Sequence, residues 1–263
     1  MIYLVSTPQR CGSTWLTRML CATADSRDVY VDGLRLGFRL VPPCAPGSVE
    51  ELSAFFQRHP KVRVFKTHDI GAKDFDAICA AIPELRVLTL HRDFRDVVVS
   101  RYFYLRYYWR NDPRLGALPV PVAQFFARIG GMPDRAALAA MLDAPFMLAW
   151  AREWAAFERE FSTPHALRMR YAGMLDESDF PRLAKFTGLR LRKAKPFASE
   201  QAEETQQTGR TGMVRFNRRG RAGEWREWFT PEDGAMLESM ALDECRRQGA
   251  ERSGVISIRR PSP

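Results

Sequence analysis

Hydrophobic and polar residues alternate along this chain in two distinct patterns. Short apolar runs are typical of buried strands, whereas longer segments repeat hydrophobic residues at the spacing of one helix face. Strands are predicted at residues 2–6, 62–66, 85–90 and 166–170. Helices are predicted at residues 14–24, 49–58, 73–81, 94–109, 145–161, 178–187 and 231–247. This order predicts an α/β fold with a central parallel sheet flanked by helices on both faces, and ligands at the carboxyl ends of the strands.

Two stretches interrupt this alternation. Prolines divide residues 110–143, and Gly130–Gly131 break a short amphipathic piece, so we expect a helical insertion beside the site. Polar side chains without helical periodicity begin at residue 198, and a mobile loop is predicted over about residues 198–224. With 263 residues, of which 46% are hydrophobic, the chain can bury one sizeable core. We therefore expect a single domain over residues 1–263.

The loop after the first predicted strand has the chemistry of a phosphate site. A strand, a tight loop and a helix start present backbone N–H groups and a positive dipole end to an anion. Arg10 adds a cation, and Ser13 and Thr14 add hydroxyl groups. These features predict a P-loop-type three-layer fold. The loop is not the nucleotide triphosphatase form, because Gly12 is not followed by Lys. An ordinary strand-to-helix turn would explain Gly12 and Ser13, but not Arg10.

Further segments in a fixed order make this prediction specific. Lys66-Thr67-His68 end the second predicted strand, and Arg92 to Ser100 follow the third. Tyr171 follows the fourth strand, and a basic segment with two glycines lies at residues 216–225. Together with the first loop, these segments resemble the sulfotransferases that use 3′-phosphoadenosine 5′-phosphosulfate (PAPS), the soluble cytosolic kind in particular. The resemblance extends from residue 2 to about residue 230.

The resemblance implies a set of site residues, with PAPS as co-substrate and no metal. Arg10, Cys11, Gly12, Ser13 and Thr14 would surround the 5′-phosphosulfate, Trp15 and Tyr171 would lie near the adenine, and Arg92, Ser100, Arg218, Arg219 and Gly220 would hold the 3′-phosphate. His68 would be the general base on the acceptor hydroxyl. Lys66 and Arg10 would offset charge on the departing phosphate.

The residue chemistry supports His68 independently. Imidazole titrates near neutrality, which suits removal of a proton from a hydroxyl. The chain has four histidines, and only His68 follows a predicted strand with Lys two residues away. Residues i and i+2 of an extended segment face the same side, so Lys66 and His68 can share one site. Without the resemblance, a surface histidine after a strand would be the simpler interpretation.

The basic segments also have simpler interpretations. Arg92 to Asp96 could form a charged helix start in which Asp93 is the cap, although a capped helix start is itself an anion site. Residues 218–221 could be a solvated basic loop or a nucleic-acid patch. The glycines at 220 and 223 favour an ordered loop, since glycine permits close backbone approach.

Several positions depart from the family pattern. Arg10 and Arg219 stand where Lys is typical, Cys11 where Ser is common, and Glu224 where Asp is typical. Arg10 cannot donate its proton to the leaving oxygen, and a thiol is a weaker donor than a hydroxyl. The family's dimer contact also differs, because it corresponds here to Arg226, Thr230-Pro231 and Ala235. Pro replaces Val and Ala replaces Glu, which leaves the oligomeric state open.

Composition restricts the partners. The net charge of +9 indicates an anionic partner, which PAPS fits, as would an acidic polysaccharide or a lipid headgroup. No nucleic-acid-binding signature accompanies the charge. No stretch approaches the ~18 apolar residues of a membrane span, and the start lacks the pattern of a signal peptide. The five cysteines are scattered without a Cys-x-x-Cys pair, so neither a disulfide framework nor a zinc site is expected. A cytoplasmic location is predicted.

Two alternatives remain at this point. A P-loop nucleotide kinase or phosphotransferase would need Lys in the loop and a carboxylate at a strand end for magnesium, and residues 85–91 supply no carboxylate. A non-catalytic protein that binds 3′,5′-ADP would keep the fold, but Lys66 and His68 argue against it. The acceptor is predicted to be a small molecule, glycan or lipid with a hydroxyl group.

Overall fold

A four-stranded parallel sheet lies at the centre of the computed structural model, which describes residues 1–23, 49–58, 64–68, 70–108, 118–190 and 221–249. The strands are β1 (Ile2–Ser6), β2 (Val64–Thr67), β3 (Leu85–His91) and β4 (Ala166–Arg170), in the order β2-β1-β3-β4. In the register of this sheet, Val5 of β1 is paired with Lys66 of β2 and with Leu88 of β3. The carboxyl ends of β1, β2 and β3 therefore meet at one edge.

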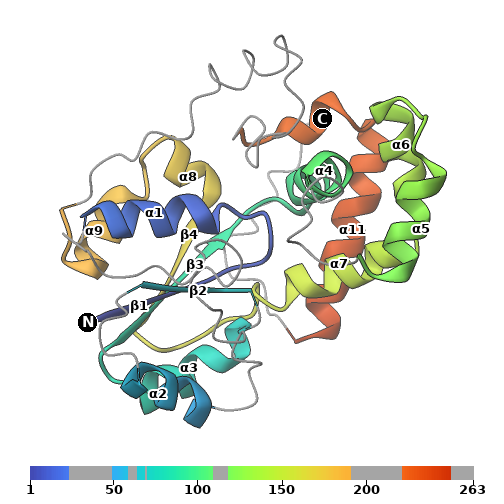
Figure 1. Ribbon diagram of the computed structural model, residues 1–263. Coiled ribbons are helices and arrows are strands. Elements are labelled where there is room, and N and C mark those ends of the chain that lie inside the picture. Colours follow the sequence, from blue (N-terminus) through green and yellow to red (C-terminus); the bar gives the residue numbers. More distant parts are fainter. Residues whose placement is uncertain (24–48, 59–63, 69, 109–117, 191–220, 250–263) are drawn as a thin grey trace.

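Helices cover both faces of the sheet (Figure 1). One layer holds α1, α8 and α9, the opposite layer holds α2 and α3, and the remaining labelled helices gather beside the sheet. The helices are α1 (Ser13–Thr23), α2 (Val49–Arg58), α3 (Phe75–Ala81), α4 (Phe94–Phe103), α5 (Val120–Arg128), α6 (Asp134–Met141), α7 (Phe146–Ala155), α8 (Tyr171–Leu175), α9 (Phe180–Thr187) and α11 (Pro231–Arg247). The predicted α/β class, with a parallel sheet between helical layers, is confirmed.

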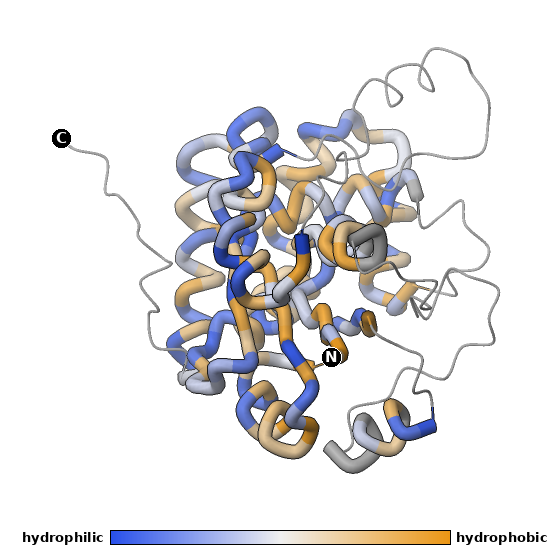
Figure 2. Tube along the Cα trace, turned by 90° about the vertical axis from the view of Figure 1, so that its left-hand side faces the viewer, coloured by the Kyte–Doolittle hydropathy of each residue, from blue (hydrophilic) through white to orange (hydrophobic). Residues whose placement is uncertain are grey.

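Alternating side chains of the strands divide the core into two parts. Tyr3 and Val5 of β1 belong to the larger cluster, which includes α1 and the helices beside the sheet. Ile2 and Leu4 belong to the smaller cluster, which contains side chains of α2 and α3. This follows from the two-residue period of a strand, which sends successive side chains to opposite faces. Figure 2 shows hydrophobic and hydrophilic positions alternating along the helices, as expected of helices with one buried face.

Some element boundaries differ from the predicted ones. The predicted helix 94–109 is α-helical only to Phe103 and continues as a π-helical turn, Tyr104–Tyr108. The predicted helix 145–161 ends at Ala155 and is followed by turns. The five-residue α8 was not predicted, because so short a helix shows no periodicity. A short 3-10 helix, Ala72–Asp74, precedes α3.

The two irregular stretches are described only in part. Within residues 110–143, helices α5 and α6 are described, and Asp134 of α6 accepts hydrogen bonds of 2.7 Å from the hydroxyls of Tyr102 and Tyr107. Of the loop predicted over 198–224, residues 198–220 lie outside the described residues. No helix among those described is both long and apolar enough to span a bilayer.

Candidate donor-binding and catalytic site

The loop between β1 and α1 is shaped by glycine and by close packing on an aromatic ring. Gly12 has a φ of 95°, and a Cβ atom there would lie 2.8 Å from two ring carbons of Tyr171. Only glycine satisfies both constraints without strain. Ser13 and Thr14, which open α1, are buried. Because the loop follows the carboxyl end of β1, the start of α1 lies at this edge of the sheet, where its backbone dipole favours an anion.

Trp15 and Tyr171 lie next to each other beneath this loop. Their rings are 6.4 Å apart between centres in an edge-to-face arrangement, which is the favourable geometry for an aromatic pair. Tyr171 is the first residue of α8, directly after β4, so the sheet itself positions its ring. Burial raises the pKa of Tyr171, although the nearby cations Arg92 and Arg10 oppose this effect. The two residues predicted near the adenine are thus brought together.

Arg92 is buried and held from several sides. Its guanidinium lies 4.3 Å from the centre of the Tyr171 ring. One terminal nitrogen donates a 2.9 Å hydrogen bond to the carbonyl of Arg10, and the other donates a 3.2 Å bond to the carbonyl of Arg221. The carbonyl of Arg92 itself accepts a 2.9 Å bond from the indole of Trp154. Because a guanidinium has five N–H donors, donors remain for a phosphate oxygen.

Arg10 connects the loop to α4. Its backbone has a φ of 68°, which is uncommon for a residue with a side chain. Its Nε donates a 3.3 Å hydrogen bond to the hydroxyl of Ser100, and its guanidinium lies 4.5 Å from the centre of the Tyr104 ring. Arg10 and Ser100, predicted at opposite ends of the donor, are therefore in direct contact in this structure.

Lys66 and His68 both face the same loop. Nζ of Lys66 donates a 3.3 Å hydrogen bond to the hydroxyl of Thr14. Nδ1 of His68 lies 2.7 Å from the carbonyl oxygen of Thr7. A carbonyl can only accept, so the proton of the neutral imidazole is assigned to Nδ1 and the lone pair to Nε2. This tautomer has the lone pair that a general base requires.

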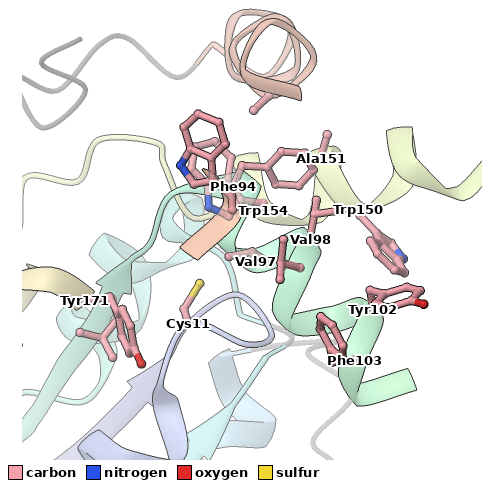
Figure 3. Close-up of a cluster of buried hydrophobic side chains, with 14 of the residues drawn as sticks. Cys11, Phe94, Val97, Val98, Tyr102, Phe103, Trp150, Ala151, Trp154 and Tyr171 are labelled. Atoms are coloured by element: carbon pink, nitrogen blue, oxygen red, sulfur yellow. The ribbon is translucent and has the colours of Figure 1, made fainter. Parts of the chain in front are cut away.

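Cys11 has a different setting from its neighbours. Its side chain is fully buried in the larger core cluster and points toward α4 (Figure 3). Its backbone N–H donates a 3.4 Å hydrogen bond to the carbonyl of Pro8. Burial raises the pKa of the Cys11 thiol well above its ordinary value. A contact between its thiol and a phosphate has no support in this geometry, so its predicted place around the phosphosulfate rests on the loop backbone alone.

The structure adds a residue that sequence reasoning missed. Asp96 of α4 is buried, and its carboxylate accepts hydrogen bonds from the backbone N–H groups of Gly223 at 2.6 Å and Trp225 at 3.0 Å. Burial raises the pKa of Asp96, although Arg92 and the two N–H groups oppose the rise. The Arg-Asp pair at 95–96 is the available signal in the sequence, but it indicates only a charged helix start there.

Arg218, Arg219 and Gly220 lie outside the described residues, so their predicted contact with the 3′-phosphate stays a prediction. Within the described ranges, no group of three or more His, Cys, Asp or Glu side chains comes together as a metal site would require. The remaining predicted residues, from the first loop, β2, α4 and α8, converge on the carboxyl edge of the sheet.

The parallel sheet, its helical layers and the loop before α1 define an α/β protein with the P-loop-type fold. The sulfotransferase domain family matches residues 3–244, and the chain belongs to this family. No curated protein matches its sequence significantly. The predicted enzyme class, sulfotransferase, is thereby confirmed.

Two solved structures are similar in fold. Mouse sulfotransferase SULT7A1 complexed with PAP gives a TM-score of 0.56 at 16% identity, covering 93% of this chain and 84% of that one. Retinol dehydratase in complex with androsterone and inactive cofactor PAP gives a TM-score of 0.51 at 17% identity, covering 96% and 83% of the two chains. At this level of identity, these similarities concern the fold.

Proposed function

We propose that this protein transfers the sulfuryl group of PAPS to a hydroxyl of a small-molecule, glycan or lipid acceptor, with His68 as general base. The observation that carries this proposal is the 2.7 Å contact between Nδ1 of His68 and the carbonyl of Thr7. It fixes the tautomer with the lone pair on Nε2, at the edge of the sheet where the phosphate loop begins.

The charged and polar side chains at this site suit the phosphate groups of PAPS. The 5′-phosphosulfate would be held at the start of α1 by Ser13, Thr14 and Lys66, and the 3′-phosphate by Arg92 and Ser100. PAP, bound in both similar structures, is the nucleotide that remains when PAPS has lost its sulfuryl group. Androsterone in one of them is a small molecule, which supports an acceptor of that size.

The transfer needs little covalent chemistry from the protein. A bond forms between the acceptor oxygen and sulfur while the bond from sulfur to the phosphate oxygen breaks, and Nε2 of His68 receives the acceptor proton. Lys66 and Arg10 offset the negative charge that develops on the departing phosphate. Since Arg10 is always charged and cannot give up its proton, we assign any proton donation to Lys66.

Calorimetric titration with 3′,5′-ADP and with 5′-ADP tests the donor class. Both ligands carry two phosphates, and only the position of the second differs. We expect a clear preference for 3′,5′-ADP that is lost in Arg92→Ala. Equal binding, or a preference for 5′-ADP, would refute the use of PAPS and favour a nucleotide phosphotransferase.

Activity with PAPS and a panel of hydroxyl acceptors then tests His68. Removal of a general base typically lowers turnover by about 10²–10⁴-fold, and we expect this of His68→Gln. His165→Gln is the matched control, because His165 is bonded to Arg86 just before β4, away from the carboxyl edge. Full turnover in His68→Gln would contradict the assignment of His68 as general base. If the wild-type protein binds 3′,5′-ADP but shows no turnover, a non-catalytic binding protein is favoured instead.

A further inference from the structure

Asp96 joins two segments that are far apart in the sequence. It lies on the first turn of α4, and only 1% of the residue is exposed to solvent. Its two carboxylate oxygens each accept a backbone N–H from the segment Arg221–Trp225, one from Gly223 and one from Trp225. A buried carboxylate is costly unless it is hydrogen-bonded, and these two bonds provide that compensation.

Asp96 is not needed to cap its helix. Asp93 is the N-cap of α4, and its side chain accepts a 2.9 Å hydrogen bond from the backbone N–H of Arg95. Asp93 also forms an ion pair of 2.6 Å with the Arg95 guanidinium. The two carboxylates therefore have separate structural roles. Asp93 caps α4, whereas Asp96 accepts backbone N–H groups of the segment Arg221–Trp225.

The same segment also contacts Arg92. The carbonyl of Arg221 accepts a 3.2 Å hydrogen bond from the Arg92 guanidinium, two residues before the Gly223 N–H that Asp96 binds. The segment is further fixed by Trp225, whose ring lies 4.1 Å from the Arg95 guanidinium and packs against Gly234 of α11. The Arg221 carbonyl thus lies on a short piece of backbone that is fixed at its other end.

We propose that Asp96 is a positioning residue for the donor: it holds the segment Arg221–Trp225 against α4, so that the Arg221 carbonyl orients the Arg92 guanidinium toward the 3′-phosphate. This inference rests on the proposed function, since it concerns the same nucleotide site. Asp96 need not touch the nucleotide, because its effect passes through Arg221 and Arg92. It therefore acts on recognition of the 3′-phosphate rather than on the 5′-phosphate held by the loop before α1.

The ratio of the dissociation constants for 5′-AMP and 3′,5′-ADP isolates this effect. These two ligands differ only in the 3′-phosphate, so the ratio measures what that group contributes to binding. The Asn side chain in Asp96→Asn has only one oxygen, so it can accept only one of the two backbone N–H groups of the segment well, and the other N–H loses its acceptor. We expect the ratio to fall about tenfold, with little change in the affinity for 5′-AMP. A general structural defect would instead weaken the binding of both ligands equally and leave the ratio unchanged.

Asp76→Asn is the matched control, because the Asp76 carboxylate likewise accepts backbone N–H groups, but from Ser162 and Thr163 rather than from the segment. We expect it to lower thermal stability while the ratio stays at the wild-type value. The double variant Asp96→Asn/Arg92→Ala tests whether the effect of Asp96 on binding passes through Arg92. If Asp96 acts through Arg92, the ratio in this double variant equals that of Arg92→Ala alone.

Each outcome decides between the two proposals. A wild-type ratio near one would refute the donor site and this inference with it. A wild-type preference that Asp96→Asn retains would overturn the role of Asp96 alone, as would additive effects in the double variant. If Asp96→Asn does not fold, Gly223→Ala decides, because a side chain at its φ of 77° strains the same segment from the opposite side. An unchanged ratio in a folded Gly223→Ala would then reject the inference.

Discussion

Gly12→Ala is the most direct test of the loop geometry. Two separate effects act at this position. The φ of 95° disfavours any side chain, and the added methyl group would lie 2.8 Å from two ring carbons of Tyr171. The ring cannot move aside easily, since Tyr171 is buried between the loop and the Arg92 guanidinium, 4.3 Å from its centre. The free-energy cost of the strained backbone and the cost of the overlap with the ring should therefore add.

The magnitude follows from these two effects. A side chain in the left-handed region costs about 1–2 kcal/mol, and overpacking in a well-packed core costs about 1–3 kcal/mol. We expect Gly12→Ala to lower the free energy of unfolding by about 2–5 kcal/mol. Because small domains are stable by about 5–15 kcal/mol, the variant should still fold, and urea denaturation can measure the loss.

Two other glycines separate the effects. Gly188 has a φ of 70°, and no atom of the described residues lies within 4 Å of an added Cβ, so Gly188→Ala should show the backbone effect alone, about 1–2 kcal/mol. Gly131 has no positive φ, and among the described residues no atom lies within 4 Å of an added Cβ, so Gly131→Ala should be neutral or stabilising by up to about 1 kcal/mol. If Gly12→Ala loses no more stability than Gly188→Ala, the contact with Tyr171 does not constrain the loop.

Three further predictions concern charged groups. Lys66→Met, which keeps the length of the side chain, should lower turnover with PAPS at least tenfold with an unchanged far-UV spectrum, because it removes the cation next to Thr14. Burial, followed by the bond to Asp134, raises the pKa of Tyr107 to about 12, and Asp134→Asn should lower that pKa in a spectrophotometric titration. Burial alone would raise the pKa of Asp76, but backbone and hydroxyl donors outweigh it and hold the pKa below 3.8. The stability that this gives is present above pH 3.8 and is lost as the pH falls through the lowered value, so the deficit of Asp76→Asn in urea denaturation should shrink between pH 6 and pH 3.

The strands and most helices were predictable because their signals are local. β1 and β4 have the predicted bounds, and β3 extends one residue beyond the predicted 85–90. Apolar runs between polar turns mark the buried strands β1 and β3, whereas β4 contains Arg168 and Arg170 and is only partly buried. The common location of the segments that follow β1, β2 and β3 was also predictable, because parallel strands bring their carboxyl ends together. Lys66 and His68 both contact the segment around the loop between β1 and α1, as their spacing indicated.

Contacts between distant segments were not predictable in this way. Asp96 and Gly223 are 127 positions apart, and no local pattern links a carboxylate on one helix to a particular N–H so far away. The π-helical turn Tyr104–Tyr108 reads in the sequence as continued α-helix, because aromatic residues at helical spacing suit both. In this turn, Tyr104 lies under the Arg10 guanidinium, and Tyr107 donates a hydrogen bond to Asp134.

Arg10 illustrates how these distant contacts determine the state of the loop. A left-handed backbone at a residue with a side chain costs of order 1–3 kcal/mol and persists only where the surroundings enforce it. Here the enforcing groups are the Arg92 guanidinium on the Arg10 carbonyl, at 2.9 Å, and Ser100 and Tyr104 on the Arg10 side chain. Arg92 and Ser100 are also the residues proposed to hold the 3′-phosphate. The loop conformation and the proposed nucleotide binding therefore depend on the same two residues, so that a substitution at Arg92 should relax the backbone of Arg10 as well as weaken nucleotide binding.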